Sequence, residues 1–593
     1  MTDAELKDWI EMKKLRTKKY DSSVWIPLYA FSVKKEGEYF HNGFTEDIFS
    51  LKSVCINKSD FDKANTLNWN NLGNHHESRS FVEDNDYVPC DVLYKEYYGI
   101  DGIFPVIIQR VGHDLPEVWD LNQDIVVALK LYREGDTWIC PDEDYIEVAH
   151  LLRDDKGNPI KIEIRNEFLK DYLCARNMGL VLTWYNEHEK YVSVEPNFGW
   201  SNEHEINSYE NGRWEGRIFE TTNTGNPFGS DAFVMHVKRI DVDKDDDVPT
   251  LGLPTDENIS GESKTVPLRT GDAVFMVSGE IWNNELILPG DISTRVRGDE
   301  PRNYPFFKID AVGNVKTANQ LKDDGRWLWF KPDVMNALLE KHDGTLEWYT
   351  KETGRISCSY GWFVHFGINE KGFVTVYAED IAILPVWQQI IWTGFNVAPD
   401  GGVSKELLMS QLDAEPATTQ APEEFLAVEY KRLNETFMHV FGIPLFRSQK
   451  EIEELFPKLH RFRSLSETGF YELAKDLARI TADAICLKDL QSKLTIPKDT
   501  KWGSLKTLQN FLIQKAGLKD EIAKSIMSPL FGIYDMRQVD AHLGDASKDD
   551  PFISLGVSRD LPPMLRGQAM LERFVTTLCV IQKVISEKKE NEK

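Results

Sequence analysis

The sequence contains no long apolar run. Among its 593 residues, no stretch reaches the roughly 18 uncharged apolar residues that span a bilayer, and the first twenty residues lack the apolar core of an export signal. We therefore expect a protein that is neither membrane-embedded nor exported by a standard signal. We expect it to be cytoplasmic, with no membrane partner.

Cysteine and the common cofactor motifs are also scarce. The seven cysteines are far apart and never form a C-x-x-C pair, which argues against a zinc ribbon or a disulfide framework and for reduced thiols. The sequence has no P-loop, no G-x-G-x-x-G and no G-x-S-x-G. We expect no cofactor and no metal.

What the chain has in excess is negative charge, and this charge is unevenly distributed. The net charge is −27, yet residues 424–593 carry 26 Lys and Arg against 24 Asp and Glu, so residues 1–423 carry about −29. An acidic body repels a polyanion, whereas a near-neutral tail with local basic clusters does not. If any part of the chain contacts nucleic acid, it should be the tail.

The amino-terminal two thirds predict β structure. Short apolar or alternating runs recur between Gly, Asn and Asp, for example at 104–111, 124–132, 179–185 and 232–240, and 362–378 has the pattern of a hairpin. One helix is expected at about 166–177, and a shorter one at 332–341. We predict a multidomain α+β protein, with a β-rich sensor or regulatory region over 1–240 and a second β-rich subdomain over 265–410.

Two polar segments predict breaks in this organisation. Residues 241–264 are acidic and rich in Pro and Gly, and they suggest a long loop or a subdomain boundary. Residues 411–424 have the composition of an exposed linker. Beyond it, over 425–593, apolar residues recur at helical spacing and predict an all-α bundle, with helices near 424–441, 450–463, 467–495, 503–516, 519–528, 530–543 and 562–590.

Within this bundle, residues 531–545 are the most informative. Pro529 should break the preceding helix and Gly544 should end this one. At about 100° per residue, Ile533, Met536, Val539 and Leu543 share one side, while Arg537 and His542 flank a polar face on the other. A permanent cation and a titratable imidazole beside a polar groove suit a phosphodiester.

Arg537-x4-His542, late in a carboxy-terminal helical bundle, resembles the R-x4-6-H motif of HEPN domains. The resemblance implies a bundle that dimerises and a metal-independent endoribonuclease, as found in antiviral-defence and abortive-infection systems. It assigns the catalytic roles to Arg537 and His542, with Gln538 and Asp540 in support. Gln538 stands where active members usually carry Asn, Asp or His, so activity is open at this point.

The chemistry that the resemblance implies needs no metal. An imidazole can remove the proton of the RNA 2′-OH and another can protonate the 5′-oxygen that leaves, while arginine holds the phosphate by two hydrogen bonds. The expected partners are RNA, a second copy of the chain through the helical domain, and a phage-derived or other protein trigger at the amino-terminal region. A second cluster, Lys458, His460, Arg461 and Arg463 around Phe462, could guide RNA; a helix end complementing its dipole is the alternative.

Other chemistry-bearing fragments give weaker signals. His75–Glu77, 186–190 and 202–206 combine His with Glu but lack metal-ligand spacing, and 241–247 imitates a calcium loop without its Gly and Glu. Gln538 and the strong net negative charge leave open a non-catalytic protein whose HEPN-like domain serves only dimerisation or RNA binding. The many Trp and Tyr residues leave open a β-rich module that binds a carbohydrate or protein, with an unrelated helical tail.

Overall fold

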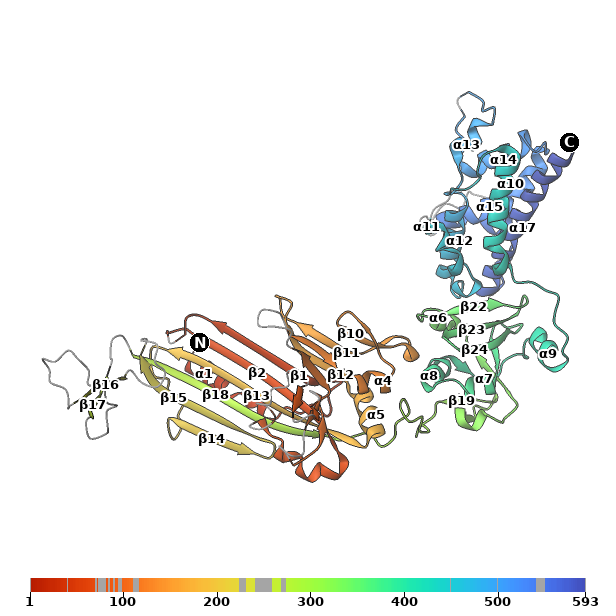
Figure 1. Ribbon diagram of the computed structural model, residues 1–593. Coiled ribbons are helices and arrows are strands. Elements are labelled where there is room, and N and C mark those ends of the chain that lie inside the picture. Colours follow the sequence, from red (N-terminus) through yellow and green to blue (C-terminus); the bar gives the residue numbers. More distant parts are fainter. Residues whose placement is uncertain are drawn as a thin grey trace. The chain divides into compact units, whose positions relative to one another are not determined.

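The computed structural model describes most of the chain, namely residues 2–39, 41–69, 72, 81–83, 86–88, 91–93, 99–109, 117–222, 231–239, 259–267, 273–447, 450–498, 500–539 and 550–591. It divides into two compact units, one of residues 1–141 and 145–301, the other of residues 302–593 with 142–144. A β-rich region thus precedes a helical one, as predicted (Figure 1).

The first unit is built on one antiparallel sheet of twelve strands, in the order β14-β15-β18-β13-β2-β1-β12-β11-β10-β9, with β6 and β5 joining beside β2. The sheet's long central strands are clearly visible in Figure 1. The strands are β1 (Trp25–Glu36), β2 (Thr45–Asn57), β5 (Val92–Leu93), β6 (Gly102–Ile103), β9 (Tyr132–Glu134), β10 (Thr137–Cys140), β11 (Ile146–Arg153), β12 (Pro159–Arg165), β13 (Met178–Val192), β14 (His204–Tyr209), β15 (Gly212–Thr222) and β18 (Ala273–Ile287).

Short helices and hairpins complete this unit. Helix α1 (Asp3–Glu11) begins with a capping box between Thr2 and Glu5, and Ile10 packs on the sheet where Gly279 leaves room: a Cβ there would lie 2.1 Å from the Ile10 carbonyl oxygen. The other elements are α2 (Lys13–Arg16), η1 (Lys58–Thr66), α4 (Gln123–Ala128), η3 (Pro141–Glu143), α5 (Asn166–Arg176), and the pairs β3 (Phe81–Glu83) with β4 (Asp86–Val88), β7 (Val106–Gln109) with β8 (Val118–Leu121), and β16 (Asp231–Arg239) with β17 (Ile259–Pro267).

Two sequence predictions for this unit are wrong. Residues 124–132 were expected to form a strand, but most of them form helix α4, which Asn122 caps through its side chain; its Ile125 is buried. Residues 241–264 were expected to be a long loop or a subdomain boundary; the second alternative is contradicted, because β18 returns to the same sheet and pairs with both β13 and β15. The unit instead ends at Pro301. The expected helix near 166–177 is confirmed as α5.

The second unit opens with a six-stranded sheet in the order β22-β23-β24-β25-β21-β26. The predicted hairpin over 362–378 is confirmed as β24 and β25, and the helix expected near 332–341 is α6. The elements are β19 (Phe306–Lys308), β20 (Val315–Thr317), η5 (Ala318–Leu321), β21 (Trp327–Phe330), α6 (Asp333–Leu339), β22 (Thr345–Trp348), β23 (Thr353–Ser359), β24 (Trp362–Ile368), β25 (Val374–Tyr377), α7 (Ala378–Ala382), α8 (Val386–Phe395), β26 (Asn396–Val397) and α9 (Lys405–Leu412).

The helical bundle follows within the same unit (Figure 1). Residues 413–421 contain no helix or strand, but no division falls there, because Phe462 and Met564 of the bundle lie in the same core cluster as the sheet. The helices are η6 (Pro422–Phe425), α10 (Leu426–Phe441), α11 (Lys450–Glu453), η7 (Phe456–Lys458), η8 (Arg461–Arg463), α12 (Glu467–Ile480), α13 (Leu487–Ser492), α14 (Ser504–Gln514), α15 (Asp520–Val539), α16 (Pro551–Leu555) and α17 (Pro563–Asn591).

Candidate functional site

Helix α15 positions Arg537. The helix continues through Pro529, where the sequence predicted a break; the ring removes one backbone donor but does not end the helix here. Ile533 and Met536 are buried in the bundle core, as the helical wheel predicted. Gly532 faces α16 so closely that a Cβ would lie 2.6 Å from the Leu555 nitrogen. The apolar side of α15 is therefore fixed against its neighbours.

Arg537 lies near the end of α15 and is partly exposed, with about a third of its side chain (34%) accessible. Its Nη1 donates to Asp483 Oδ2 at 2.6 Å, and its guanidinium lies 5.9 Å from the centre of the Tyr534 ring. Asp483 follows the end of α12 and is itself exposed. The cation is therefore held by one carboxylate at the surface, where a competing anion can reach it.

The remaining residues of the motif are only partly described. Gln538 belongs to the last turn of α15, but its side chain is not described, and Asp540 and His542 lie outside the described residues. The structure therefore places Arg537 and leaves the distance between Arg537 and His542 as a prediction. Gly544, the expected helix stop, also lies outside the described residues.

Arg461 is a buried structural cation. Its guanidinium makes two hydrogen bonds of 2.7 Å to the two carboxylate oxygens of Glu423, donates to the Lys351 carbonyl at 2.8 Å, and lies 4.0 Å from the centre of the Trp348 ring. The side chains of Arg461 and Glu423 are 1% and 6% exposed. This bidentate pair joins η6, η8 and the sheet of the second unit.

The residues next to Arg461 in the sequence also make contacts within the fold. His460 is buried, and this burial lowers the pKa of its imidazole to about 4. Phe462 stacks on Trp348, and Arg463 donates to Asp476 at 2.5 Å. The expectation that His460 and Arg461 contact RNA is corrected: the apolar Phe462 draws this segment into the core. Lys458 is exposed, and its contact with RNA stays a prediction.

The His-Glu fragments also serve the fold. Residues 186–190 form the middle of β13 rather than a turn, and His188 stacks on Trp9 while its Nδ1 contacts the Trp9 carbonyl at 2.7 Å. His204 contacts Glu215 at 3.2 Å. Within the described ranges, no group of three or more His, Cys, Asp or Glu is arranged to hold a metal ion. Residues 75–77 and 241–247 lie outside those ranges.

The sequence analysis missed an acidic face of the large sheet. In the strand register, Glu187 of β13 is opposite Glu280 of β18, Glu280 is opposite Glu215 of β15, and Glu189 of β13 is opposite Glu46 of β2. Residues paired in this way share one face of an antiparallel sheet. The spacing of Glu187 and Glu189 is visible in the sequence, but the pairing that gathers the carboxylates comes from strands up to 230 residues apart.

These carboxylates are only partly neutralised. Glu215 forms ion pairs with Arg213 and Arg217, and Lys35 lies 2.6 Å from Glu46. Burial, together with the charges of Glu187 and Glu46, raises the pKa of Glu189 to about 7, and one oxygen of Glu189 is buried without a hydrogen-bond partner in the part of the chain that the structure describes. Burial likewise raises the pKa of Glu187 and Glu280.

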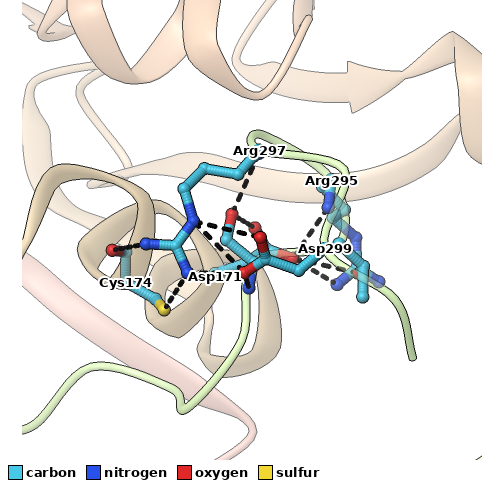
Figure 2. A network of polar contacts seen from close by, with 7 residues as sticks. Asp171, Cys174, Arg295, Arg297 and Asp299 are labelled. Atoms are coloured by element: carbon cyan, nitrogen blue, oxygen red, sulfur yellow. Dashed lines mark hydrogen bonds and ion pairs between the residues drawn. The ribbon is translucent and has the colours of Figure 1, made fainter. Parts of the chain in front are cut away.

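A third polar cluster anchors the end of the first unit (Figure 2). The buried carboxylate of Asp171, on α5, accepts hydrogen bonds from the Ser293 hydroxyl at 2.5 Å and the Arg295 backbone at 3.0 Å. Arg297 donates to the Cys174 carbonyl at 3.1 Å and also pairs with Asp299. Because these groups satisfy one another, the cluster fastens residues 293–299 to α5.

Comparison with known proteins gives no further assignment. No protein-family model, curated protein or solved structure matches the chain. No helix in the described part is both long enough and apolar enough to cross a membrane. The functional argument therefore depends on the residues themselves.

Proposed function

We propose that the carboxy-terminal helical domain is a metal-independent endoribonuclease of the HEPN type, acting in an antiviral, abortive-infection-like defence and latent until a trigger engages the amino-terminal region. The observation that supports this is the position of Arg537, which is partly exposed near the end of α15, one helical turn after the buried Ile533 and five residues before His542. The partners of this proposal are RNA, a second copy of the chain, and a protein trigger.

In this proposal the two motif residues have distinct roles. Arg537 binds the scissile phosphate through two hydrogen bonds and stabilises the charge that develops on its oxygens. His542 acts as general base on the 2′-hydroxyl and, from a second copy in a dimer, as general acid on the leaving 5′-oxygen. Gln538 and Asp540 orient these groups. The products are a 2′,3′-cyclic phosphate and a 5′-hydroxyl.

The contact between Arg537 and Asp483 offers a weak restraint on phosphate binding, in addition to any control by the amino-terminal region. A phosphate can engage the guanidinium fully only if it displaces the Asp483 carboxylate, now 2.6 Å away. An exposed ion pair of this kind is worth about 0–1 kcal/mol, so the displacement costs little once RNA is bound. Asp483 thus raises the threshold for phosphate binding without preventing it.

The first test is cleavage of mixed RNA in EDTA by the purified full-length protein, with and without lysate from phage-infected cells. We expect cleavage and cyclic-phosphate ends for wild type, and loss of at least about a hundredfold in both His542→Ala and Arg537→Ala. Arg479→Ala is the matched control, because Arg479 also pairs with an aspartate of the same bundle, at 3.2 Å, and is exposed. Identical behaviour of wild type and both motif variants in every condition would sink the proposal.

Asp483→Ala tests this restraint directly. Freeing Arg537 should raise basal cleavage several-fold, while Asp489→Ala, an exposed carboxylate in the neighbouring α13, should leave it unchanged. Equal rates for the Asp483 and Asp489 variants would show that the ion pair does not restrain the site.

A second candidate is a non-catalytic dimerisation or RNA-binding domain. It is favoured by the neutralisation of Arg537 by Asp483 and by Gln538 after the motif arginine. In that case RNA retention or dimerisation survives His542→Ala, because neither requires a titrating imidazole. Gel-shift and sedimentation measurements on the same variants separate the two functions.

A further inference from the structure

The first unit contains a basic pocket within an otherwise acidic region. Five of the seven residues at 13–19 (KKLRTKK) are Lys or Arg, although residues 1–423 carry a strong net negative charge. Three of the five basic residues, Arg16, Lys18 and Lys19, line a pocket of about 220 Å³. Its other walls come from β13, from the turn between β14 and β15, and from β18: Trp184, Tyr209–Asn211 and Asn283–Glu285.

Arg16 is held in position from two sides. Its Nε donates to the Glu11 carbonyl at 2.7 Å, and its guanidinium lies 4.1 Å from the centre of the Trp214 ring. Its Nη2 is buried and has no hydrogen-bond partner among the described residues. A buried donor of a permanent cation without an acceptor is costly, and such groups are normally satisfied by an ion, a ligand or water. The described residues therefore leave the guanidinium of Arg16, which lines the pocket, only partly satisfied.

Two carboxylates line the pocket, Glu210 and Glu285, and among the described residues neither forms an ion pair with Arg16, Lys18 or Lys19. Both oxygens of Glu285 accept backbone N–H groups, from Tyr20 at 2.8 Å and from Asp21 at 3.1 Å. Glu11 Oε2 lies 2.7 Å from Lys13, which is not a pocket residue. Consistent with a shortage of counter-charge, burial lowers the pKa of both Arg16 and Lys18.

We propose that this pocket binds the phosphate group of a small phosphomonoester. A phosphate carries about −1.5 to −2 charges and several acceptor oxygens, which suits one guanidinium and two ammonium groups better than a single carboxylate does. The indole of Trp184 and the ring of Tyr209 provide an apolar wall for the organic part. The pocket belongs to the first unit, and the proposal does not depend on ribonuclease activity.

The test is calorimetric titration of the full-length protein with phenyl phosphate, inorganic phosphate, benzoate and phenol, accompanied by tryptophan fluorescence. We expect saturable binding of phenyl phosphate, at least several-fold tighter than inorganic phosphate and benzoate, and no detectable binding of phenol. Benzoate binding as tightly as phenyl phosphate would overturn the phosphate assignment. Failure of every anion to bind would overturn the site.

Variants separate the pocket from the general attraction of a basic run. Arg16→Gln should weaken phenyl phosphate binding about tenfold or more, Arg16→Lys less, and Lys19→Glu about tenfold. Lys19 is exposed, so its substitution carries little risk to folding if Arg16 variants prove unstable. Lys14→Glu makes the same charge reversal in the same run outside the pocket and should change affinity less than twofold. Equal losses for Lys14 and Lys19 variants would contradict a specific site.

Discussion

Two buried carboxylates, one in each unit, are treated in opposite ways. In the second unit, the carboxylate of Glu423 is almost fully buried, and it is neutralised by Arg461 through two hydrogen bonds of 2.7 Å. In the first unit, Glu189 is 7% exposed, yet one of its oxygens has no hydrogen-bond partner among the described residues, and Glu187 and Glu46 add negative charge around it. One carboxylate is satisfied and the other remains a source of repulsion.

Glu189 in the first unit and His460 in the second should contribute to stability with opposite pH dependence. The pKa of Glu189 is raised from 4.5 to about 7 in the folded protein, so the unfolded state ionises first and the first unit loses stability as pH rises through this interval. The pKa of His460 is lowered from 6.5 to about 4, so the second unit loses stability as pH falls through that interval. Near-neutral pH lies at the edge of both intervals.

The largest expected effect comes from breaking the satisfied pair. Arg461→Met leaves the carboxylate of Glu423 buried without its cation, and such a change costs about 3–5 kcal/mol. We expect the second unit to lose this much stability in denaturant unfolding, with hydrogen exchange increasing in peptides from α12 and β22. The control Arg479→Met, which removes an exposed partner of Asp476, should cost no more than about 1 kcal/mol.

A double variant sharpens this result. Arg461→Met with Glu423→Leu removes both charges and fills the space with apolar atoms, so most of the lost stability should return. If the double variant is as unstable as Arg461→Met, the packing of the guanidinium on Trp348, rather than its charge, stabilises this junction.

The next largest effect comes from relieving the unsatisfied carboxylate. Glu189→Gln should stabilise the first unit by about 1–3 kcal/mol at pH 8, where wild-type Glu189 is ionised, and should change little at pH 4.5. Hydrogen exchange in peptides from β13, measured at matched intrinsic rates, localises the change. Glu220→Gln makes the same charge change at an exposed position of the same sheet and should shift stability by less than about 0.5 kcal/mol. A gain that is independent of pH would contradict the titration of Glu189.

The sequence predicted the helices and strands better than it predicted the contacts between them. Periodicity located the helix at 166–177, the hairpin at 362–378 and most of the terminal helices, because local pattern decides them. The prediction failed at Pro529, because α15 continues through this proline. Just beyond it, Gly532 packs closely against α16. The prediction also failed at 241–264, because only strand pairing shows that β18 rejoins the first sheet.

The motif of the candidate site could be predicted from the sequence, but the residues that surround it in space could not. Arg537 and His542 are recognisable by spacing, whereas Asp483, 54 residues earlier, becomes relevant only through the bundle. At 458–463 the sequence led to a different error, because residues expected at the surface are buried. The four basic or titratable residues of this cluster suggested a surface, yet Phe462 and Glu423 draw His460 and Arg461 into the core. Composition cannot distinguish a solvated cation from one that a distant carboxylate buries.

The last of the three effects tests the second half of the pH comparison. His460→Asn removes the titrating imidazole, so between pH 6.5 and about 4 the wild type should lose up to about 3 kcal/mol more stability than the variant. The difference between the two unfolding curves isolates His460 from the other groups that titrate in acid. His439→Asn, in α10, is the matched control. If wild type and His460→Asn lose stability in parallel, burial does not keep this imidazole neutral, and the opposite pH responses of the two units cannot be ascribed to His460 and Glu189.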